Sequence, residues 1–380
     1  MQNKNNHCFL LSAMQFIRAL PTCHSRLLNF SGAASPTAPK GKELTWAVSR
    51  TLRALQDDGT SDMGKKEPLV PHELIKTFFT VLGALFVDGD QDDMANTVGA
   101  ILDQIHDETY NKESDSSLVD SARGSCTSHY FCRKCKGSSD PITTSKWVFY
   151  LMLPPGTPPA TGWDVPHLLK HTLGGRTEVL DKPCSACQEE RLDREMKLAG
   201  RTTEAERKEI KMHLTYPKTE TLTTVEEWTR IPPELVLSVA RFERTSHGHH
   251  KKRKDKLAVD LSLNNAVTFG GKTAGTAKLT AVSHHYGPSI QSGHWNTWCK
   301  LPGGGGGNGG GSDHRWVAFD DGSASVKSIS PTRRQSGKTK RAGKGKGESR
   351  LVLPGSTSAA VVAYVTSATT THTSGGNGKR

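Results

Sequence analysis

The first twenty residues, MQNKNNHCFLLSAMQFIRAL (residues 1–20), place a cysteine at the beginning of an apolar run. Phe9, Ala13, Met14 and Ile17 recur at helical spacing, so we expect a buried helix that starts at or just after Cys8. A thiol at a helix N-terminus gains from the macrodipole and from free backbone N–H groups, and both favour the nucleophilic thiolate. A lone cysteine in this setting is more often a small buried hydrophobe. A nucleophilic role therefore needs a base and an orienting carboxylate elsewhere in the chain.

Candidates for both partners occur near the other end of the chain. The segment SGHWNTWCK (292–300) contains His294, and RWVAFDDG (315–322) contains Asp320 and Asp321. The two segments are predicted to be adjacent strands of a hairpin, with His294 opening one strand and Asp320 closing the other, so that the carboxylate could reach the imidazole. A His beside a Gly in a strand is ordinarily structural, and Asp-Asp-Gly is ordinarily a turn. The spacing alone leaves both interpretations open.

Two CxxC pairs form a candidate metal site: Cys132 and Cys135 in YFCRKC, and Cys184 and Cys187 in KPCSACQEE. Each pair lets two thiolates reach one ion from a tight turn, and two such turns complete the tetrahedron of a closed structural zinc site. The 48 residues between the pairs require a long β excursion that returns to the first turn. The alternative is four buried or partly oxidised cysteines. Because a closed site has no open coordination position, we expect a structural Zn²⁺ without a catalytic role.

The predicted secondary structure changes along the chain from mainly helical to mainly β-strand. Amphipathic helices are predicted over 44–55, 71–85 and 91–105. Strands are predicted over 147–153, 234–242, 279–286, 295–301, 316–319 and 359–365. Residues 188–211 hold seven acidic and seven basic side chains, and we expect them to form one solvated helix with i,i+4 pairs such as Glu190–Arg194. The Gly-rich segment 303–311 is expected to be a flexible hairpin extension.

The net charge is concentrated in two short stretches. The chain has 380 residues and a formal charge of +12, from 50 Lys and Arg against 38 Asp and Glu. Residues 244–256 contribute +5 and residues 331–350 contribute +7, so the remainder is neutral. We therefore expect a neutral core with two appended basic loops, which argues against a nucleic-acid partner. The run HHKKRKDK (249–256) fits either a nuclear-import signal or a solvated loop.

The sequence also limits the cellular setting. No stretch approaches the roughly 18 to 20 apolar residues of a membrane span, so no membrane partner is expected. Ser12 and Gln15 interrupt the apolar run after Cys8, which argues against a signal peptide. Eight cysteines are too sparse for a disulfide scaffold in a chain of this length, and the CxxC pairs point to a metal and a reducing compartment. A cytoplasmic and/or nuclear location is the expectation.

Six segments, in order, resemble the ubiquitin-specific protease family of papain-like cysteine deubiquitinases. MQNKNNHCFLLSAMQ resembles the Cys box LxNxGNTCFLNSxLQ, and residues 69–105 resemble the stretch around QQDAHEFLxxLLDxL. The CxxC pairs lie where the family has its zinc-bearing fingers. IPPELVLSVARF resembles the LPxxLxxxLKRF strand, the segments around His294 and Asp320 resemble the His box, and AAVVAYV (359–365) resembles the closing strand. The positions in register in the first two motifs are Asn3, Asn6, Cys8, Phe9, Leu10, Ser12, Gln15, Gln91, Asp93, Leu102 and Asp103.

This resemblance implies an α+β, papain-like cysteine protease fold with a helical thumb, a β-rich palm and zinc-ribbon β fingers. One catalytic domain would span residues 1–366, with the thumb over about 1–110, the fingers over about 126–230 and the palm over about 231–366. The inserts 303–311 and 331–350 would be disordered, as would a tail over 367–380. The chain begins two residues before Asn3, so we expect either that the strand that normally precedes the Cys box is absent or that this is a truncated version of a longer protein.

The resemblance also implies a deubiquitinating cysteine protease that hydrolyses the isopeptide bond after the C-terminal Gly of ubiquitin. Cys8 would be the nucleophile, His294 the general base, Asp320 the residue that orients the base, and Asn3 an oxyanion donor. The matching substrate-binding positions are Asp93, Gly293 and Trp295. Asp93 would hold the tail of ubiquitin, and Gly293 would line a channel too narrow for a Cβ. Ubiquitin and ubiquitinated proteins would be the partners. The alternatives are an inactive ubiquitin-binding module or a zinc-ribbon nucleic-acid-binding protein.

Several positions depart from the family pattern without removing a triad member. Asn5 replaces a Gly, where Asn is the next most tolerant residue for positive φ. His7 replaces a Thr, and we expect it to be exposed rather than to perturb the pKa of Cys8. Asn96 and Thr97 replace a Glu-Phe pair, which predicts weaker ubiquitin binding and lower efficiency.

Overall fold

The structure is a computed structural model of the chain. It describes residues 6–57, 71–138, 140–160, 162–174, 177–214, 221–244, 250–263, 268–269, 272–273, 276–289, 292–300, 315–320, 323–328, 350–351 and 359–366. The predictions for 303–311, for 331–349 and for 367–380 lie outside these residues. The chain divides into two compact units, and each is described by itself. Unit 1 comprises Met1–Gly124, Lys146–Leu169 and Ile231–Arg380, and unit 2 comprises Ser125–Ser145 and Lys170–Arg230. Residues 146–169 therefore cluster with unit 1, whereas the sequence placed them within the span 126–230.

Unit 1 begins with a group of helices that pack around a shared apolar core. The α-helices are α1 (Cys8–Arg18), α2 (Pro21–Leu28), α3 (Glu43–Asp57), α4 (His72–Val81) and α5 (Met94–Thr109), with 3-10 turns η1 (Ser31–Ala34) and η2 (Asp120–Ala122). The four predicted helices are confirmed. The additional helix α2 has a Pro at its first position, where the missing N–H costs nothing. Every residue of α1 from Cys8 to Ile17 is buried, so this helix lies in the centre of the core.

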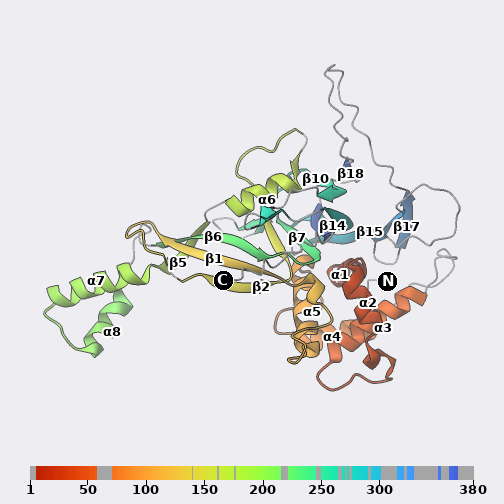
Figure 1. The fold of residues 1–380 in the computed structure, drawn as a ribbon, viewed down its shortest axis with the longest axis horizontal. Coiled ribbons are helices and arrows are strands. Elements are labelled where there is room, and N and C mark those ends of the chain that lie inside the picture. The colour runs from red at the N-terminus through yellow and green to blue at the C-terminus, as the bar shows by residue number, and fades with distance from the viewer. Residues whose placement is uncertain are drawn as a thin grey trace, which may run out of the picture. The chain divides into compact units, whose positions relative to one another are not determined.

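An eight-stranded sheet completes unit 1, in the order β17-β16-β15-β14-β19-β7-β3, with β11 paired to β14. Figure 1 shows the helices α1 to α5 together and the strands of this sheet beside them. The strands are β3 (Phe149–Met152), β7 (Glu234–Ala240), β11 (Ser262–Leu263), β14 (Ala277–Ser289), β15 (Ser292–Lys300), β16 (Arg315–Asp320), β17 (Ser323–Ser328) and β19 (Ala359–Thr366). All pairs are antiparallel except β3 with β7. The predicted strands are thus confirmed within one sheet.

Shorter strands in unit 1 pair outside this sheet. β4 (Trp163–Asp164) and β18 (Arg350–Leu351) flank β10 (Leu257–Asp260), β8 (Phe242–Arg244) pairs with β9 (His250–Lys252), and β12 (Thr268–Phe269) pairs with β13 (Lys272–Thr273). The helix α6 (Val165–Gly174) follows β4 directly. Within the described residues, no helix combines the length and the apolar character that crossing a membrane requires.

The basic run 249–256 is partly built into unit 1 rather than appended to it. Lys252 is buried. The guanidinium of Arg253 pairs with Asp255 at 2.8 Å and donates to the carbonyls of Leu153 and Pro154. Lys254 and Lys256 are exposed. The expectation of a solvated loop is therefore wrong for Lys252 and Arg253, because their charged ends have acceptors in other segments of the unit.

Unit 2 consists of a four-stranded sheet and two helices. The strand order is β2-β1-β6-β5, with β1 (Gly124–Cys132), β2 (Ile142–Lys146), β5 (Thr177–Pro183) and β6 (Thr221–Arg230). β1 and β6 are antiparallel along nearly their whole length, from Ser125 opposite Arg230 to Cys132 opposite Leu222. The sheet thus carries the first cysteine of the metal candidate to the end of β1.

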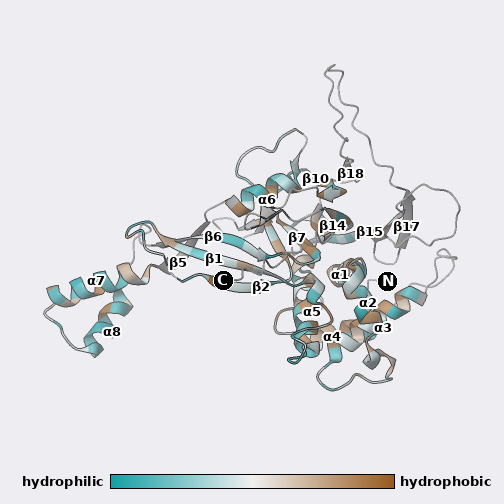
Figure 2. Cartoon of the chain, in the orientation of Figure 1, coloured by the Kyte–Doolittle hydropathy of each residue, from teal (hydrophilic) through white to brown (hydrophobic). Residues whose placement is uncertain are grey.

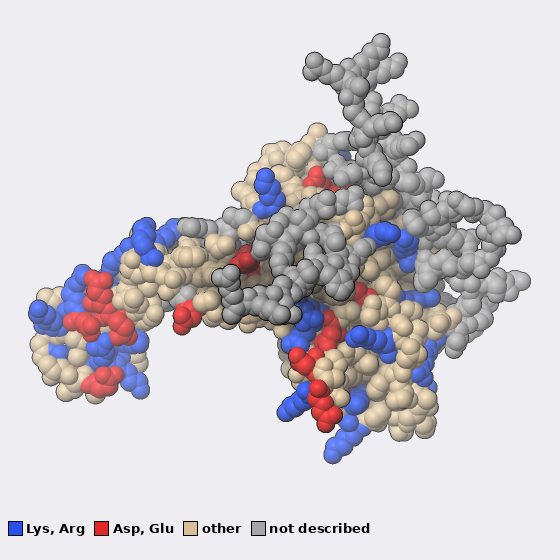
Figure 3. All heavy atoms as spheres, in the orientation of Figure 1, with Lys and Arg blue, Asp and Glu red and all other residues tan. Residues whose placement is uncertain are grey.

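The charged segment 188–211 forms two helices, not the single helix that was predicted. α7 (Ser185–Leu198) ends before Gly200, which has φ of +62°. α8 (Glu204–His213) begins with a capping box between Thr203 and Glu206, and such a box starts a new helix. Glu190 and Arg194 pair at 2.9 Å as predicted. Most residues of both helices are hydrophilic, and acidic and basic side chains are interspersed on their surface (Figures 2 and 3).

Candidate active site and metal site

Cys8 is the first residue of α1, and only 1% of its surface is exposed. The chain enters this helix through Asn6, which has φ of +56° and donates from Nδ2 to the carbonyl of Gly89 at 3.1 Å. The first N–H groups of an α-helix have no intrahelical acceptor, so the thiol lies beside potential donors for a developing negative charge. The left-handed conformation was expected at Asn5. Asn5 and the proposed oxyanion donor Asn3 lie outside the described residues.

His7 is buried, which corrects the expectation that it is exposed. Only 4% of its surface is accessible, and its Nε2 lies 2.7 Å from Oδ1 of Asp88. Its ring also packs against Phe79 of α4, with 5.4 Å between ring centroids. His7 therefore holds the entry of α1 against the segment that precedes α5. Its partner is 81 residues away in the chain, a separation at which local sequence patterns carry no signal.

The structure brings His294 and Asp320 together. β15 and β16 are antiparallel neighbours, as predicted, and Nε2 of His294 lies 2.5 Å from Oδ1 of Asp320. The side chains are 33% and 53% exposed, so solvent can reach this pair. The carboxylate therefore lies at Nε2, and Nδ1 is the second nitrogen of the ring. Asp321 lies outside the described residues.

Two contacts between α1 and β15 show how the helix that begins at Cys8 runs along the strand that carries His294. Oγ1 of Thr297 donates to the carbonyl of Ser12 at 3.3 Å, and Sγ of Cys299 contacts the carbonyl of Gln15 at 3.2 Å. The helix and the strand therefore run in the same direction. Their N-terminal ends, which carry Cys8 and His294, lie toward the same side of the core. A Cys-His-Asp constellation needs its members on one side of the core, and the direction of α1 and β15 meets that condition.

Gly293 is fixed as a glycine by close backbone packing. It has φ of +154°, and a Cβ at this position would lie 2.3 Å from the carbonyl of Tyr286 and 2.5 Å from Nε2 of His285. Its own carbonyl accepts a hydrogen bond of 2.6 Å from Nε2 of Gln91. The need for a narrow channel for the substrate stays a prediction. The structure gives an independent reason why a side chain is not tolerated here.

Trp295 is buried at 2% exposure, and its Nε1 donates to the carbonyl of Asp92 at 3.1 Å. Together with the Gln91–Gly293 bond, this contact ties the start of β15 to the segment before α5. The predicted role of Trp295 in substrate binding stays a prediction. A buried indole would act on a substrate by holding that segment.

Asp93 caps α5 and belongs to a partly desolvated pair of carboxylates. Its Oδ1 accepts from the backbone N–H of Ala95 at 2.6 Å. Burial, with a further contribution from the charge of Asp92, outweighs the helix-capping bonds and raises the pKa of Asp93 to about 6. Burial also raises the pKa of Asp92. Carboxylates whose negative charge is disfavoured in the free protein gain when a donor or a cation binds to them.

The two residues that depart from the family pattern at the start of α5 are both satisfied. Asn96 accepts a hydrogen bond of 2.7 Å from the hydroxyl of Tyr150, which lies on β3. Thr97 is buried, and its hydroxyl donates to the carbonyl of Asp93 at 3.0 Å. Burial, followed by the charges of Asp93 and Asp92, raises the pKa of Tyr150 to about 12, so that its hydroxyl remains a donor.

The four predicted metal ligands converge in unit 2. The Sγ atoms of Cys132, Cys135, Cys184 and Cys187 all lie within 4.8 Å of one another, and this is the only such group among the described residues. Cys132 and Cys187 are 3.6 Å apart, and Cys135 and Cys184 are 3.7 Å apart. Zn–S bonds of about 2.3 Å give a tetrahedral edge of about 3.8 Å, so the donor set fits Zn²⁺. All four are free thiols, in contrast to the alternative of oxidised cysteines.

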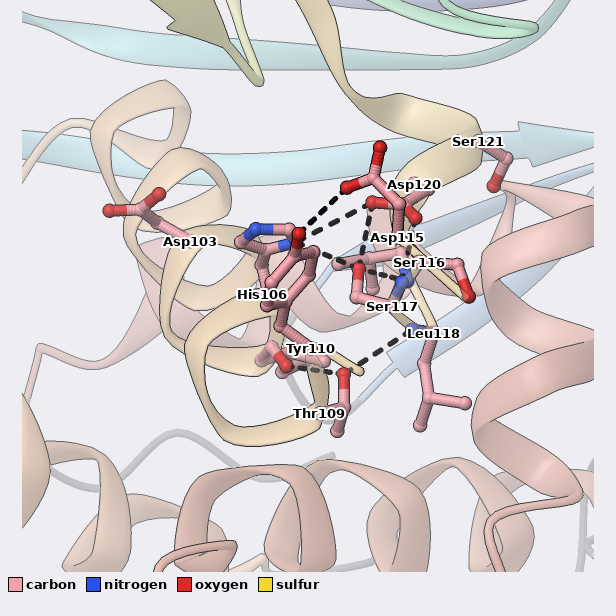
Figure 4. Close-up of polar contacts among 12 residues, drawn as sticks. Asp103, His106, Thr109, Tyr110, Asp115, Ser116, Ser117, Leu118, Asp120 and Ser121 are labelled. Carbon is pink, nitrogen blue, oxygen red and sulfur yellow. Dashed lines mark hydrogen bonds and ion pairs between the residues drawn. The ribbon is translucent and has the colours of Figure 1, made fainter. Parts of the chain in front are cut away.

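A second grouping of Ser, His and Asp, which the sequence patterns do not indicate, joins the last turn of α5 to the segment after it (Figure 4). Nδ1 of His106 is 2.9 Å from Oγ of Ser117, but this hydroxyl donates to Oδ1 of Asp120 at 2.9 Å. Asp120 also accepts from the N–H of Ser117 at 2.6 Å. Because the carboxylate takes the proton of the serine, the imidazole is not placed to act as its base. This cluster closes the turn after the helix.

Comparisons with known proteins place the chain. The sequence model of the family described as "Ubiquitin carboxyl-terminal hydrolase" matches residues 1–352. Among solved structures, chains of the SAGA DUB module Ubp8/Sgf11/Sus1/Sgf73 bound to monoubiquitin and bound to ubiquitin aldehyde each give a TM-score of 0.59 at 15% identity, covering 97% of this chain and 69% of theirs. The yeast SAGA DUB module gives 0.58 at 14% identity, covering 97% and 68%. Curated protein sequences yield no match. The structural likeness confirms the predicted α+β fold.

Proposed function

Since the chain belongs to the ubiquitin carboxyl-terminal hydrolase family and is therefore a cysteine-type deubiquitinase, we propose that it cleaves the isopeptide bond after the C-terminal Gly of ubiquitin through Cys8, His294 and Asp320. The observation that carries the proposal is the 2.5 Å contact between His294 and Asp320. This contact lies near the N-terminal end of β15, and α1 points its own N-terminal end, with Cys8, toward the same side. The ubiquitin and ubiquitin aldehyde bound to the structural relatives support ubiquitin as the partner.

The reaction follows from the positions of these groups. Nδ1 of His294 takes the proton of the Cys8 thiol, and the thiolate attacks the carbonyl carbon of the terminal Gly. The oxyanion is stabilised by N–H groups in the first turn of α1 and by the side chain of Asn3. The imidazolium, held by Asp320, then protonates the departing lysine amine, and a thioester remains. His294 removes a proton from a water molecule, which hydrolyses the thioester and regenerates the thiol.

The carboxylates before α5 suit the extended tail that precedes the scissile bond. We assign tail binding to Asp93, whose charge is destabilised by burial and by Asp92 in the free protein. Hydrogen-bond donors or cations on the tail would stabilise the negative charge of this carboxylate. Part of the binding free energy would therefore come from their interaction with Asp92 and Asp93. Gly293 and Trp295 contribute by holding the segment that carries Asp93, since they are bonded to Gln91 and Asp92.

The four cysteines of unit 2 are proposed to hold one structural Zn²⁺. When bound, the ion would join the end of β1 to the start of α7, because Cys132 ends β1 and Cys184 caps α7. The sequence joins these two turns only through 48 residues, so the metal is expected to be a large part of the stability of unit 2. Four thiolate ligands leave no position for substrate or water.

The test is a ubiquitin probe with a C-terminal electrophile. The wild-type chain should form a covalent adduct, and the Cys8→Ala variant should form none. Cys23→Ala is the matched control, because Cys23 is also buried in the first turn of a helix, α2, but burial and Glu234 raise the pKa of its thiol well above the usual range. This control should label like the wild type. A folded wild-type chain that binds ubiquitin without labelling would identify it as an inactive ubiquitin-binding module.

A further inference from the structure

Lys252 lies buried against β14, the strand that pairs with the strand carrying His294. It is the last residue of β9 and is 8% exposed. Its Nζ donates to the carbonyl of His285 and lies 3.1 Å from Nδ1 of the same residue. A buried ammonium costs free energy unless its donors are satisfied. This lysine is therefore held in place by one residue of β14, and it stabilises that residue in return.

The ammonium group determines the state of the His285 ring. Burial lowers the pKa of Lys252 to about 8, so at neutral pH the group is mainly an ammonium. An ammonium has only donors, so the ring nitrogen that faces it accepts, and the proton of the imidazole then resides on Nε2. Burial, followed by the charges of Lys252 and His294, lowers the pKa of His285 to about 4. The ring is consequently neutral at physiological pH, chiefly because it is buried, and the contact with Lys252 sets its tautomer.

His285 contacts the residues on both sides of His294. Its Nε2 occupies the space where a side chain on Gly293 would be, 2.5 Å from the position of a Cβ. Its ring packs on Trp295, directly opposite in the β14–β15 register, with 4.8 Å between centroids. Gly293 and the indole of Trp295, the two neighbours of His294, thus pack against one imidazole, whose Nδ1 faces Lys252.

We propose that Lys252 is a positioning residue for the hydrolytic reaction: it holds His285 as the neutral Nε2–H tautomer, which packs against Gly293 and Trp295 and so keeps the imidazole of His294 on Asp320. This inference rests on the proposed function, because it assigns His294 the role of general base. It gives one member of the basic run 249–256 a function inside the fold.

Steady-state kinetics on a ubiquitin amide substrate test the proposal with matched variants. Lys252→Met removes the ammonium and keeps much of the apolar stem. We expect kcat to fall about 10- to 100-fold, as small displacements of a catalytic group do, with KM within about twofold because no substrate contact is lost. Lys254→Met removes an equal charge from an exposed position two residues away and should retain wild-type kcat. Lys252→Arg keeps a charged donor and should recover most of the loss.

A second measurement is independent of turnover. Nitrogen chemical shifts of ¹⁵N-histidine in the wild-type chain, with the His285 signals assigned through His285→Gln, should show protonated Nε2 and unprotonated Nδ1 at neutral pH. The opposite tautomer, or a folded Lys252→Met with wild-type kcat, overturns the positioning role alone. A wild-type chain without turnover overturns the proposed function and the inference that rests on it. If Lys252→Met does not fold, the tautomer in the wild-type chain decides.

Discussion

Replacing Asp93 by Asn should make the protein more stable and less active. The amide oxygen of Asn can still cap α5 by accepting from the N–H of Ala95, as Asp93 does at 2.6 Å. The substitution removes the negative charge that burial and Asp92 destabilise. A change that preserves the cap and removes this unfavourable charge separates the structural role of the residue from its role in binding.

The magnitude follows from the displaced pKa. Asp93 titrates at about 6 in the folded chain, against 3.8 for an unperturbed carboxyl. Each pKa unit corresponds to about 1.4 kcal/mol, and partial exposure reduces the total to about 1 to 2 kcal/mol. Between about pH 4 and pH 6 the folded chain binds more protons than the unfolded chain, so this contribution to stability falls as pH rises. The cost is complete above about pH 6 and absent below about pH 4.

Urea unfolding at two pH values measures this effect. At pH 7.5, Asp93→Asn should raise the free energy of unfolding by about 1 to 2 kcal/mol, and the difference should shrink at pH 4.5. Asp107→Asn, at an exposed position on the same helix, should change it by less than about 0.5 kcal/mol. The kcat/KM for a ubiquitin substrate should fall only for Asp93→Asn. A variant that is less stable than the wild type at pH 7.5, or equally active, would refute the reasoning.

Three further substitutions test other parts of the structure. Asp320→Asn should lower kcat about 5- to 1000-fold, because a solvent-accessible ion pair contributes about 1 to 4 kcal/mol; this is less than the roughly 10⁴-fold loss at a buried triad aspartate, and unchanged kinetics would exclude Asp320 from the triad. Elemental analysis should find one zinc per wild-type chain and none in Cys187→Ser, and the variant should show faster amide hydrogen exchange in unit 2. A wild-type chain purified with no bound metal would contradict the zinc assignment. Glu234→Gln should lower the free energy of unfolding by about 2 to 4 kcal/mol in a urea titration. The reason is that the buried carboxylate accepts from the N–H groups of Thr22 and Cys23 and from the hydroxyl of Ser121. Glu73→Gln, at a side chain that is 62% exposed, should leave the free energy of unfolding unchanged, and equal effects of the two substitutions would refute this account.

The sequence predicts those features of the fold that depend on local periodicity. The helix after Cys8, the hairpin that joins His294 to Asp320 and the convergence of the two CxxC pairs all follow from spacing and residue type. The helix α2 was missed because four of its eight residues are polar or charged at Thr22, His24, Ser25 and Arg26, which leaves little apolar signal. A Gly and a following capping box could have indicated the break between α7 and α8.

The polar contacts around the site could not be predicted in the same way. His7 and Asp88 are 81 residues apart, and Lys252 and His285 are 33 apart. Periodicity indicates which side chains are buried, but it does not identify the partner that satisfies a buried charge. The histidine in the Cys box and the lysine in the basic run were therefore both interpreted as exposed. Their burial follows from tertiary packing of segments that are distant in the sequence.

The departures at the start of α5 bear on substrate binding more than on the integrity of the site. Thr97 bonds to the carbonyl of Asp93, and Asn96 accepts from Tyr150, so the first turn of the helix and its cap are intact. The segment before this turn remains bonded to Gly293 and Trp295 on either side of His294. Because these supports are preserved, the Asn at the exposed position 96 should affect KM through lost contacts with ubiquitin rather than kcat through displacement of the base. Asn96→Glu should accordingly lower KM with little change in kcat, whereas Thr97→Phe should destabilise the chain, because Thr97 has no exposed surface and a larger ring would overpack the core.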